Sequence, residues 1–117
     1  MRFGINFEQG EIVFVPLPFT NLSSTKKRPV IIISRTDYNR RSADFICCGI
    51  TSNIKNADYS ILIENKDLAK GFLPIASRIK VNTIFTLEKS IAIKSFGKVK
   101  EEIIKMVKQE LYKIIQN

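Results

Sequence analysis

The sequence PVIIIS at residues 29–34 is a continuous apolar run that begins with a proline. Neighbouring side chains of a strand point to opposite faces, so an uninterrupted run of β-branched residues is typical of a strand that is buried on both faces. A proline fits the first position of such a strand, because it has no amide hydrogen to donate. We therefore expect residues 29–34 to form a doubly buried strand, with Arg28 at its entry.

Short β-branched and aromatic runs on either side predict the rest of a sheet. The run at residues 11–15 follows Gly10, and Pro16 and Pro18 then interrupt it, so we expect the first strand to end there. The polar segment 20–27 predicts a loop that ends in basic residues. Polar turns are expected at 35–42 and at the Gly-Phe-Leu-Pro sequence of 71–74, and further strands at 44–50, 59–63, 75–81, 84–87 and 90–95.

The end of the chain has a different periodicity. Apolar residues recur at intervals of about four, with lysines between them, which predicts an amphipathic helix from about residue 100 to 115. The expected apolar face consists of Ile103, Ile104, Val107, Leu111, Ile114 and Ile115. Strands followed by a single helix, without a βαβ rhythm, predict an α+β fold: a curled antiparallel sheet or small barrel with an attached helix.

Size and charge limit the number of domains and the kind of partner. A chain of 117 residues with 44% hydrophobic residues fits one folded domain, residues 1–117. A formal net charge of +8 suits a polyanionic partner such as nucleic acid, an anionic membrane surface or an acidic protein. The apolar runs fall far short of the ~20 residues that cross a bilayer, so we expect a cytoplasmic protein without a membrane partner.

Several enzyme classes have no candidate residues here. The chain has no histidine, its eleven carboxylates are scattered, and no glycine-rich phosphate loop is present, so we expect no metal, no cofactor and no histidine-based catalytic triad. Cys47 and Cys48 are adjacent in an apolar run, where they would point to opposite faces, and we interpret them as buried free thiols. The acidic pair Glu101–Glu102 fits the first turn of the predicted helix.

Basic and hydroxyl side chains remain as candidates. Lys26, Lys27 and Arg28 end the polar loop, and Thr51, Ser52 and Asn53 follow a strand. The two lysines fit a solvated charged loop equally well. Arg28 differs, because the following proline restricts it at the edge of a buried strand, and a guanidinium binds phosphate in a bidentate manner.

In order and spacing, four segments of the chain resemble one known family: GEIVFV at residues 10–15, the polar loop, KRPVIIIS at 27–34 and ITSN at 50–53. They are similar to the MazF/PemK (also called Kid) toxins of type II toxin–antitoxin systems, which are mRNA interferases. The resemblance covers nearly the whole chain and implies an SH3-like antiparallel β-barrel with a C-terminal helix. It also implies a homodimer, with RNA sites along the subunit interface, and a cognate acidic antitoxin.

The resemblance further implies sequence-specific cleavage of single-stranded RNA, without a metal, into a cyclic phosphate and a 5′-hydroxyl. Attack by the 2′-hydroxyl of the substrate itself needs no protein nucleophile, only a positioned phosphate, charge stabilisation and proton transfer. By the family pattern, Arg28 would contact the scissile phosphate and Thr51 would hydrogen-bond one of its oxygens. Some relatives use an Arg-x-Asp pair as acid and base, and the stretch we match to it, residues 75–77, has neither residue.

Base and backbone contacts are expected from the loop and from strand ends. Phe19, Thr20 and Asn21 would stack on and read splayed bases, although Phe19 fits a core position equally well. Lys26, Lys27, Ser52, Asn53, Arg78 and Lys80 complete the expected RNA contacts, with solvated surface charge as the alternative for Arg78 and Lys80.

Two other functions fit the same sequence. One is a non-catalytic barrel that binds single-stranded nucleic acid through aromatic residues and a basic groove. The other is an interaction module whose basic face binds an acidic protein.

Overall fold

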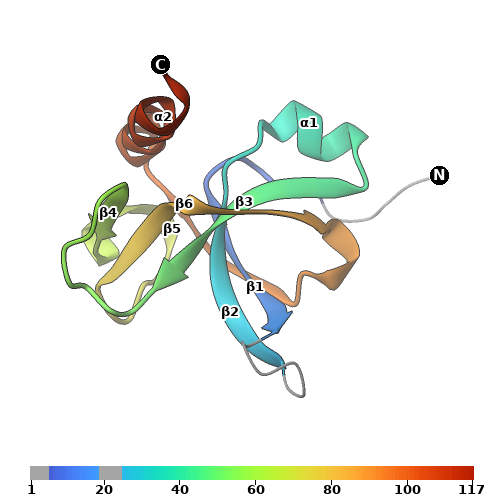
Figure 1. The fold of residues 1–117 in the computed structure, drawn as a ribbon. Helices are drawn as coiled ribbons and strands as arrows, with labels where there is room; N and C mark the ends of the chain where they lie inside the picture. The colour runs from blue at the N-terminus through green and yellow to red at the C-terminus, as the bar shows by residue number, and fades with distance from the viewer. Residues whose placement is uncertain (1–5, 19–24) are drawn as a thin grey trace.

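The structure is a computed structural model that describes residues 6–18 and 25–117. In these ranges the chain forms one curled sheet with two α-helices (Figure 1). The strands are β1 (Glu11–Pro18), β2 (Thr25–Ile32), β3 (Asp44–Thr51), β4 (Ser60–Ile63), β5 (Leu68–Gly71), β6 (Ser77–Glu88) and β7 (Lys94–Val99). The helices are α1 (Thr36–Arg41) and α2 (Glu101–Ile115), with 3-10 turns η1 (Asn65–Asp67) and η2 (Lys89–Ile91).

All strand neighbours are antiparallel, in the order β4-β6-β3-β2-β1-β7-β5. The strands curl into a half-barrel, with α2 against β6 and β4 and α1 beside the start of β3 (Figure 1). The predicted fold class, a curled antiparallel sheet with a C-terminal helix, is therefore confirmed. Among the described residues, no helix has the length and apolar character to span a bilayer.

The apolar run of β2 is buried on both faces, as predicted. Val30 and Ile32 belong to a core cluster with Phe45 and Cys47, whereas Ile31 belongs to a second cluster with Cys48. The adjacent cysteines thus point to opposite faces as unpaired thiols. Burial raises the pKa of both thiols to about 12, which keeps them protonated and poorly nucleophilic at neutral pH.

The β1–β2 hairpin is longer than predicted. β1 continues through Pro16 and Pro18, and β2 already begins at Thr25, so Lys26 and Lys27 lie in a strand and not in a loop. The strand pairing explains why β1 tolerates these prolines. β7 pairs with β1 only along residues 11–14, so β7 does not need the amide hydrogens that Pro16 and Pro18 lack.

The turn predicted at residues 35–42 is wrong in part, because it contains helix α1. The side chain of Asn39 is buried and anchors this helix. Its amide nitrogen donates to the carbonyls of Phe7 and Ser34, each at 3.1 Å, and its amide oxygen accepts from the hydroxyl of Ser34. Lys89 Nζ donates to the backbone carbonyl of Asn39 at 2.7 Å, so distant segments hold the helix in place.

The second half of the sheet departs from the prediction in its boundaries. The strands expected at 75–81 and 84–87 are one strand, β6, whose register shifts opposite the Cys48–Gly49 step. β5 was not predicted, and the last strand begins at Lys94 and not at residue 90.

Helix α2 matches the predicted range. Its predicted apolar face holds for the first two turns and fails in the last, where Ile114 and Ile115 are exposed.

Candidate functional site

Arg28 and Thr51 lie on neighbouring strands, at the point where those strands separate. The pairing of β2 with β3 matches Ile32 with Cys47, Ile31 with Cys48 and Val30 with Gly49, and it ends there. Two more residues in the same register would place Arg28 opposite Thr51. Pro29 has no amide hydrogen to donate to a continued β2–β3 ladder, so a proline stands in the sequence where the two strands separate.

A cavity of about 500 Å³ lies at this opening, and we call it the Arg28–Thr51 cavity. Its polar lining consists of Arg28, Thr51, Ser52 and Ser77. The first three of these are expected at the RNA site from the sequence, and the fold brings them to one cavity although 22 residues separate Arg28 from Thr51. Its volume falls within the range of about 300–1,000 Å³ that is typical of ligand pockets.

The rest of the wall is apolar, and three of its eight residues are aromatic. Phe14 and Phe96 stack on each other with ring centroids 4.7 Å apart, and Phe72 and Ile75 stand on the connection between β5 and β6. None of these four residues is expected at the site from the sequence, because they come from β1, β7 and a turn that no spacing rule connects. From the sequence, two of them have only structural positions: Phe72 in the predicted turn at 71–74, and Phe14 in the predicted first strand.

Thr51 also lines a second, polar cavity of about 190 Å³, which we call the Arg78 cavity. Arg78 and Lys80 contribute to it from β6, with Asn53 and Lys55 from the segment after β3. The guanidinium of Arg78 is oriented by two hydrogen bonds that it donates, from Nε to the carbonyl of Ile54 at 2.9 Å and to the hydroxyl of Ser60 at 3.1 Å. The predicted residues Asn53, Arg78 and Lys80 thus lie together.

The hydroxyl of Thr51 has a defined local role. Its oxygen accepts a hydrogen bond from the backbone N–H of Asn53 at 3.1 Å. A hydroxyl that accepts in this way keeps its own hydrogen for donation. Thr51 can therefore donate to an anionic oxygen at the boundary of the two cavities.

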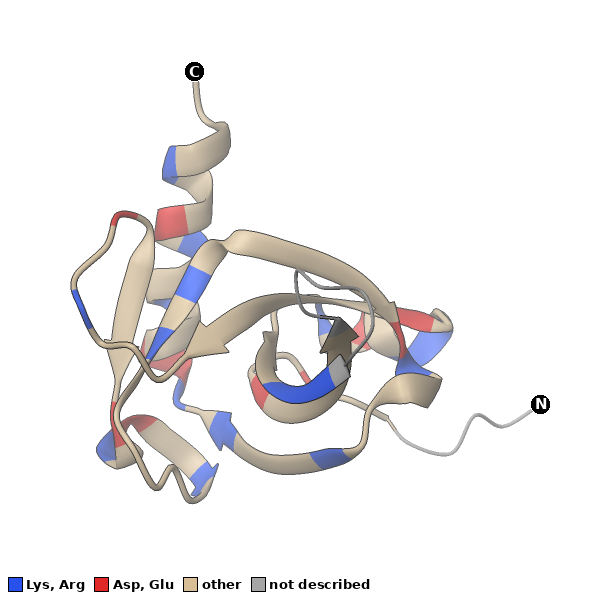
Figure 2. Ribbon diagram, turned by 60° about the horizontal axis from the view of Figure 1, so that its bottom comes forward, with Lys and Arg blue, Asp and Glu red and all other residues tan. Residues whose placement is uncertain are grey.

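The remaining predicted residues lie elsewhere. Lys26 and Lys27 form a basic segment of β2 together with Arg28 (Figure 2), but they line neither of these cavities. Phe19, Thr20 and Asn21 lie outside the described residues.

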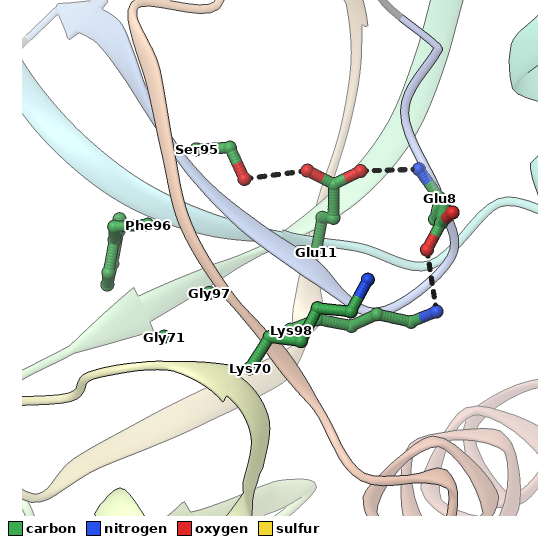
Figure 3. A pocket seen from close by; sticks show the side chains of 8 residues that line it. All are labelled: Glu8, Glu11, Lys70, Gly71, Ser95, Phe96, Gly97 and Lys98. Atoms are coloured by element: carbon green, nitrogen blue, oxygen red, sulfur yellow. Dashed lines mark hydrogen bonds and ion pairs between the residues drawn. The ribbon is translucent and has the colours of Figure 1, made fainter.

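A third cavity, of about 430 Å³, contains charges that neutralise one another (Figure 3). The Glu11 carboxylate accepts from the Ser95 hydroxyl at 2.6 Å and from the backbone N–H of Glu8 at 2.7 Å. Lys98 Nζ lies 2.7 Å from the Glu8 carboxylate, and this hydrogen bond lowers the pKa of Glu8. Two carboxylates at a cavity disfavour a polyanion, so we interpret this cluster as a structural clamp between β7 and the segment before β1.

The described residues contain no group of three or more histidine, cysteine or acidic side chains arranged to hold a metal ion.

The chain matches a known family model along residues 8–115, namely the PemK-like, MazF-like toxin of type II toxin-antitoxin systems. No curated protein matches it in sequence.

Three solved structures have a similar fold. An endoribonuclease from a mycobacterial species is 18% identical, with a TM-score of 0.76, over 96% of this chain and 93% of that one. A mycobacterial endoribonuclease in complex with its cognate antitoxin is 18% identical, with a TM-score of 0.75, over 92% of both chains. A MazE–MazF structure from Deinococcus radiodurans is 17% identical, with a TM-score of 0.77, over 95% and 97%.

Proposed function

Because the chain belongs to the PemK/MazF family of type II toxin–antitoxin toxins, we propose that it is an endoribonuclease that cuts single-stranded mRNA at specific sequences without a metal. The observation that carries this proposal is the joint presence of Arg28 and Thr51 in one cavity, at the point where β2 and β3 separate. Solved structures of similar fold include proteins described as endoribonucleases, which supports the same function.

In the proposed reaction the 2′-hydroxyl of the RNA attacks the neighbouring phosphorus. The bond from phosphorus to the 5′-oxygen of the next nucleotide breaks, and the products are a 2′,3′-cyclic phosphate and a 5′-hydroxyl. The attacking hydroxyl loses one proton and the leaving oxygen gains one, so the exchange is balanced and no oxidant or cofactor is required. The protein has to position the phosphate and stabilise its developing charge.

Arg28 and Thr51 supply these two effects. The planar guanidinium can donate two parallel hydrogen bonds to non-bridging oxygens, and its charge offsets the additional negative charge of the phosphorane. The Thr51 hydroxyl donates a third hydrogen bond from the other side of the opening. Donors that the fold has already oriented need little reorganisation during the reaction, which is why their removal is costly.

The test is to incubate purified wild type, Arg28→Ala, Thr51→Ala and Lys108→Ala with a long RNA in EDTA. Lys108, an exposed residue of α2, controls for the loss of one positive charge away from the cavity. We expect wild type and Lys108→Ala to cut, and each of the other two to lose about 10²–10³-fold in kcat. The new ends should accept phosphate from a polynucleotide kinase without prior phosphatase treatment, as a 5′-hydroxyl does.

Two outcomes contradict the proposal at different levels. If wild type leaves the RNA intact, the nuclease function is wrong, and RNA binding without cleavage would then favour the non-catalytic barrel. If wild type cuts and Arg28→Ala cuts equally fast, the function stands and the assigned mechanism is wrong. Arg28→Lys separates charge from geometry, because lysine keeps the charge but cannot form the bidentate contact.

We also propose that the toxin acts as a cytoplasmic homodimer and is neutralised by a cognate acidic antitoxin. The net charge of +8 supports an acidic partner, and two of the similar structures are an endoribonuclease in complex with its cognate antitoxin and a MazE–MazF structure. Sedimentation equilibrium tests the dimer. Co-expression with the neighbouring reading frame tests the antitoxin, which should restore growth to cells that express the toxin.

A further inference from the structure

We propose that the apolar part of the Arg28–Thr51 cavity is the subsite for one unstacked nucleobase next to the scissile phosphate, and that Phe72 is its stacking face. This inference rests on the proposed function, because it assigns a role to the base that accompanies the reacting phosphate. It differs from the sequence-based expectation, which placed base stacking at Phe19.

The exposure of Phe72 is the first argument. This side chain is 63% exposed, and Ile75, three residues later on the same connection, is 60% exposed. Both line the cavity, so two large apolar side chains stand in solvent beside the polar pair Arg28 and Thr51. Exposed apolar surface at a concave site is typical of a binding surface that is covered when its ligand is present.

The local structure holds Phe72 in this position. The next residue, Leu73, is buried, and its backbone N–H donates to the side-chain oxygen of Asn65 at 2.8 Å. On the other side, Gly71 pairs with Gly97 at the contact of β5 with β7. The backbone on both sides of Phe72 is thus fixed, so this segment loses little conformational entropy when a ligand stacks on the ring.

Two further aromatic side chains line the same cavity. Phe14 and Phe96 form a stacked pair with an interplanar angle of 25°, and both line the cavity together with Phe72. A cavity with aromatic walls and an arginine at its polar rim matches a nucleotide, which joins a planar base to a phosphate. Proteins recognise single-stranded RNA through such aromatic platforms, on which unstacked bases lie.

The Arg78 cavity offers a place for the next phosphodiester of the RNA. It shares Thr51 with the Arg28–Thr51 cavity, but its lining is polar and basic, with Arg78, Lys80 and Lys55. An apolar cavity and a basic cavity on either side of one threonine suit a base on one side and the next phosphodiester on the other. A purely apolar ligand would make no use of this second cavity.

The experiment compares wild type with Phe72→Ala, Phe72→Trp and Tyr112→Ala. Tyr112 is the matched control, because it is an aromatic residue of α2 that is 60% exposed. Cleavage kinetics on a single-stranded RNA give KM and kcat separately. Binding is measured with short oligonucleotides that carry 2′-O-methyl groups throughout, which prevents cleavage, and the fluorescent base 2-aminopurine at one position each.

We expect Phe72→Ala to raise KM by about 5- to 150-fold, the change that corresponds to the loss of one stacked base, with kcat changed much less. It should also abolish the quenching of 2-aminopurine at one position of the series. Phe72→Trp should restore both, and Tyr112→Ala should resemble wild type. If the role of Phe72 were merely structural, Phe72→Ala would lower kcat as well as raise KM, and 2-aminopurine would still be quenched at the same position.

The inference is overturned if Phe72→Ala has the KM and the quenching pattern of wild type, or if Tyr112→Ala produces the same changes. Failure of the proposed function looks different, because wild type would then not cut at all. In that case the binding series still decides: quenching at one position that depends on Phe72 supports the base subsite, and quenching that is independent of Phe72 overturns it.

Discussion

Gly71 shows how a single backbone position shapes the cavity. Its φ of +83° lies in the left-handed region, and a Cβ at this position would lie 2.2 Å from the carbonyl oxygen of Phe96. A glycine is therefore required where β5 meets β7. The close approach places Phe72, which follows Gly71, on the same cavity as Phe96, which precedes Gly97.

Gly71→Ala should therefore destabilise the fold by at least about 1–3 kcal/mol, since it combines an unfavourable φ with a backbone clash. The measurement is the urea midpoint of unfolding. Gly49→Ala is the control, because φ is not positive there and a Cβ would lie 3.4 Å from the nearest atom, a methyl group of Thr83. A Gly71→Ala midpoint equal to that of Gly49→Ala would contradict the argument.

At this scale the sequence predicted three of the four polar residues that line the Arg28–Thr51 cavity, but neither Ser77 nor the cavity itself. Arg28 stands out because Pro29 and a buried strand follow it, and Thr51 because it ends a strand. Phe72 and Phe96 have no such local signal. They line one cavity because strand pairing joins Gly71 to Gly97, and that contact between residues distant in sequence depends on the curl of the whole sheet.

The elements are predicted best where local preference and packing agree. β2 and α2 have strong sequence signals: α2 forms over the predicted range, and the apolar run of β2 forms a buried strand, although β2 begins at Thr25 and ends at Ile32. Helix α1 was missed because a buried asparagine holds it, through contacts with Phe7 and Lys89 that are far away in the sequence. The last turn of α2 was assigned to the core by its period, but it extends past the sheet, so Ile115 stays exposed.

Replacement of single isoleucines along α2 tests this description. Ile104→Ala removes a buried side chain of the core cluster and should cost about 2–5 kcal/mol. Ile115→Ala makes the same chemical change at a side chain that is 69% exposed and should stay within about 0.5 kcal/mol. Chemical denaturation of both variants gives the two values. A large cost for Ile115→Ala would instead mean that a partner or a second copy covers the end of the helix.

The Glu8–Lys98 clamp should make stability depend on pH. The hydrogen bond from Lys98 lowers the pKa of Glu8, so the carboxylate stabilises the fold above the unfolded pKa, and this contribution disappears as the pH falls through the folded pKa. We expect Glu8→Gln to lower Tm at pH 7, with a difference from wild type that shrinks in acid below about pH 4.5.

Lys98 provides the control for this clamp in a double-mutant cycle. Lys98→Gln should lower Tm at pH 7 to a similar extent, and the double variant should lose less than the sum of the two single changes, because both remove the same ion pair. A difference between Glu8→Gln and wild type that grows in acid would contradict the assigned direction.

At the scale of the whole molecule, the charge has a defined pattern. The positive groups on the proposed RNA path are Arg28 at the Arg28–Thr51 cavity and Lys55, Arg78 and Lys80 in the Arg78 cavity. In the cavity with Glu8 and Glu11, the acidic and basic side chains neutralise one another. Composition alone predicted a polyanionic partner. It could not predict the surface that binds it, because that requires strand ends which the sheet brings together.

The salt dependence of RNA binding measures how many of these groups contact phosphate. For single strands, log Kobs falls with log salt concentration by about 0.7 for each phosphate that the protein neutralises. Lys80→Gln should therefore make the slope shallower by about 0.7, measured with a 2′-O-methyl oligonucleotide that is not cleaved. Lys108→Gln removes the same charge from an exposed position on α2 and should leave the slope unchanged. Equal slopes for wild type and Lys80→Gln would place the RNA backbone outside the Arg78 cavity, since a contact with phosphate there must release counterions when it forms.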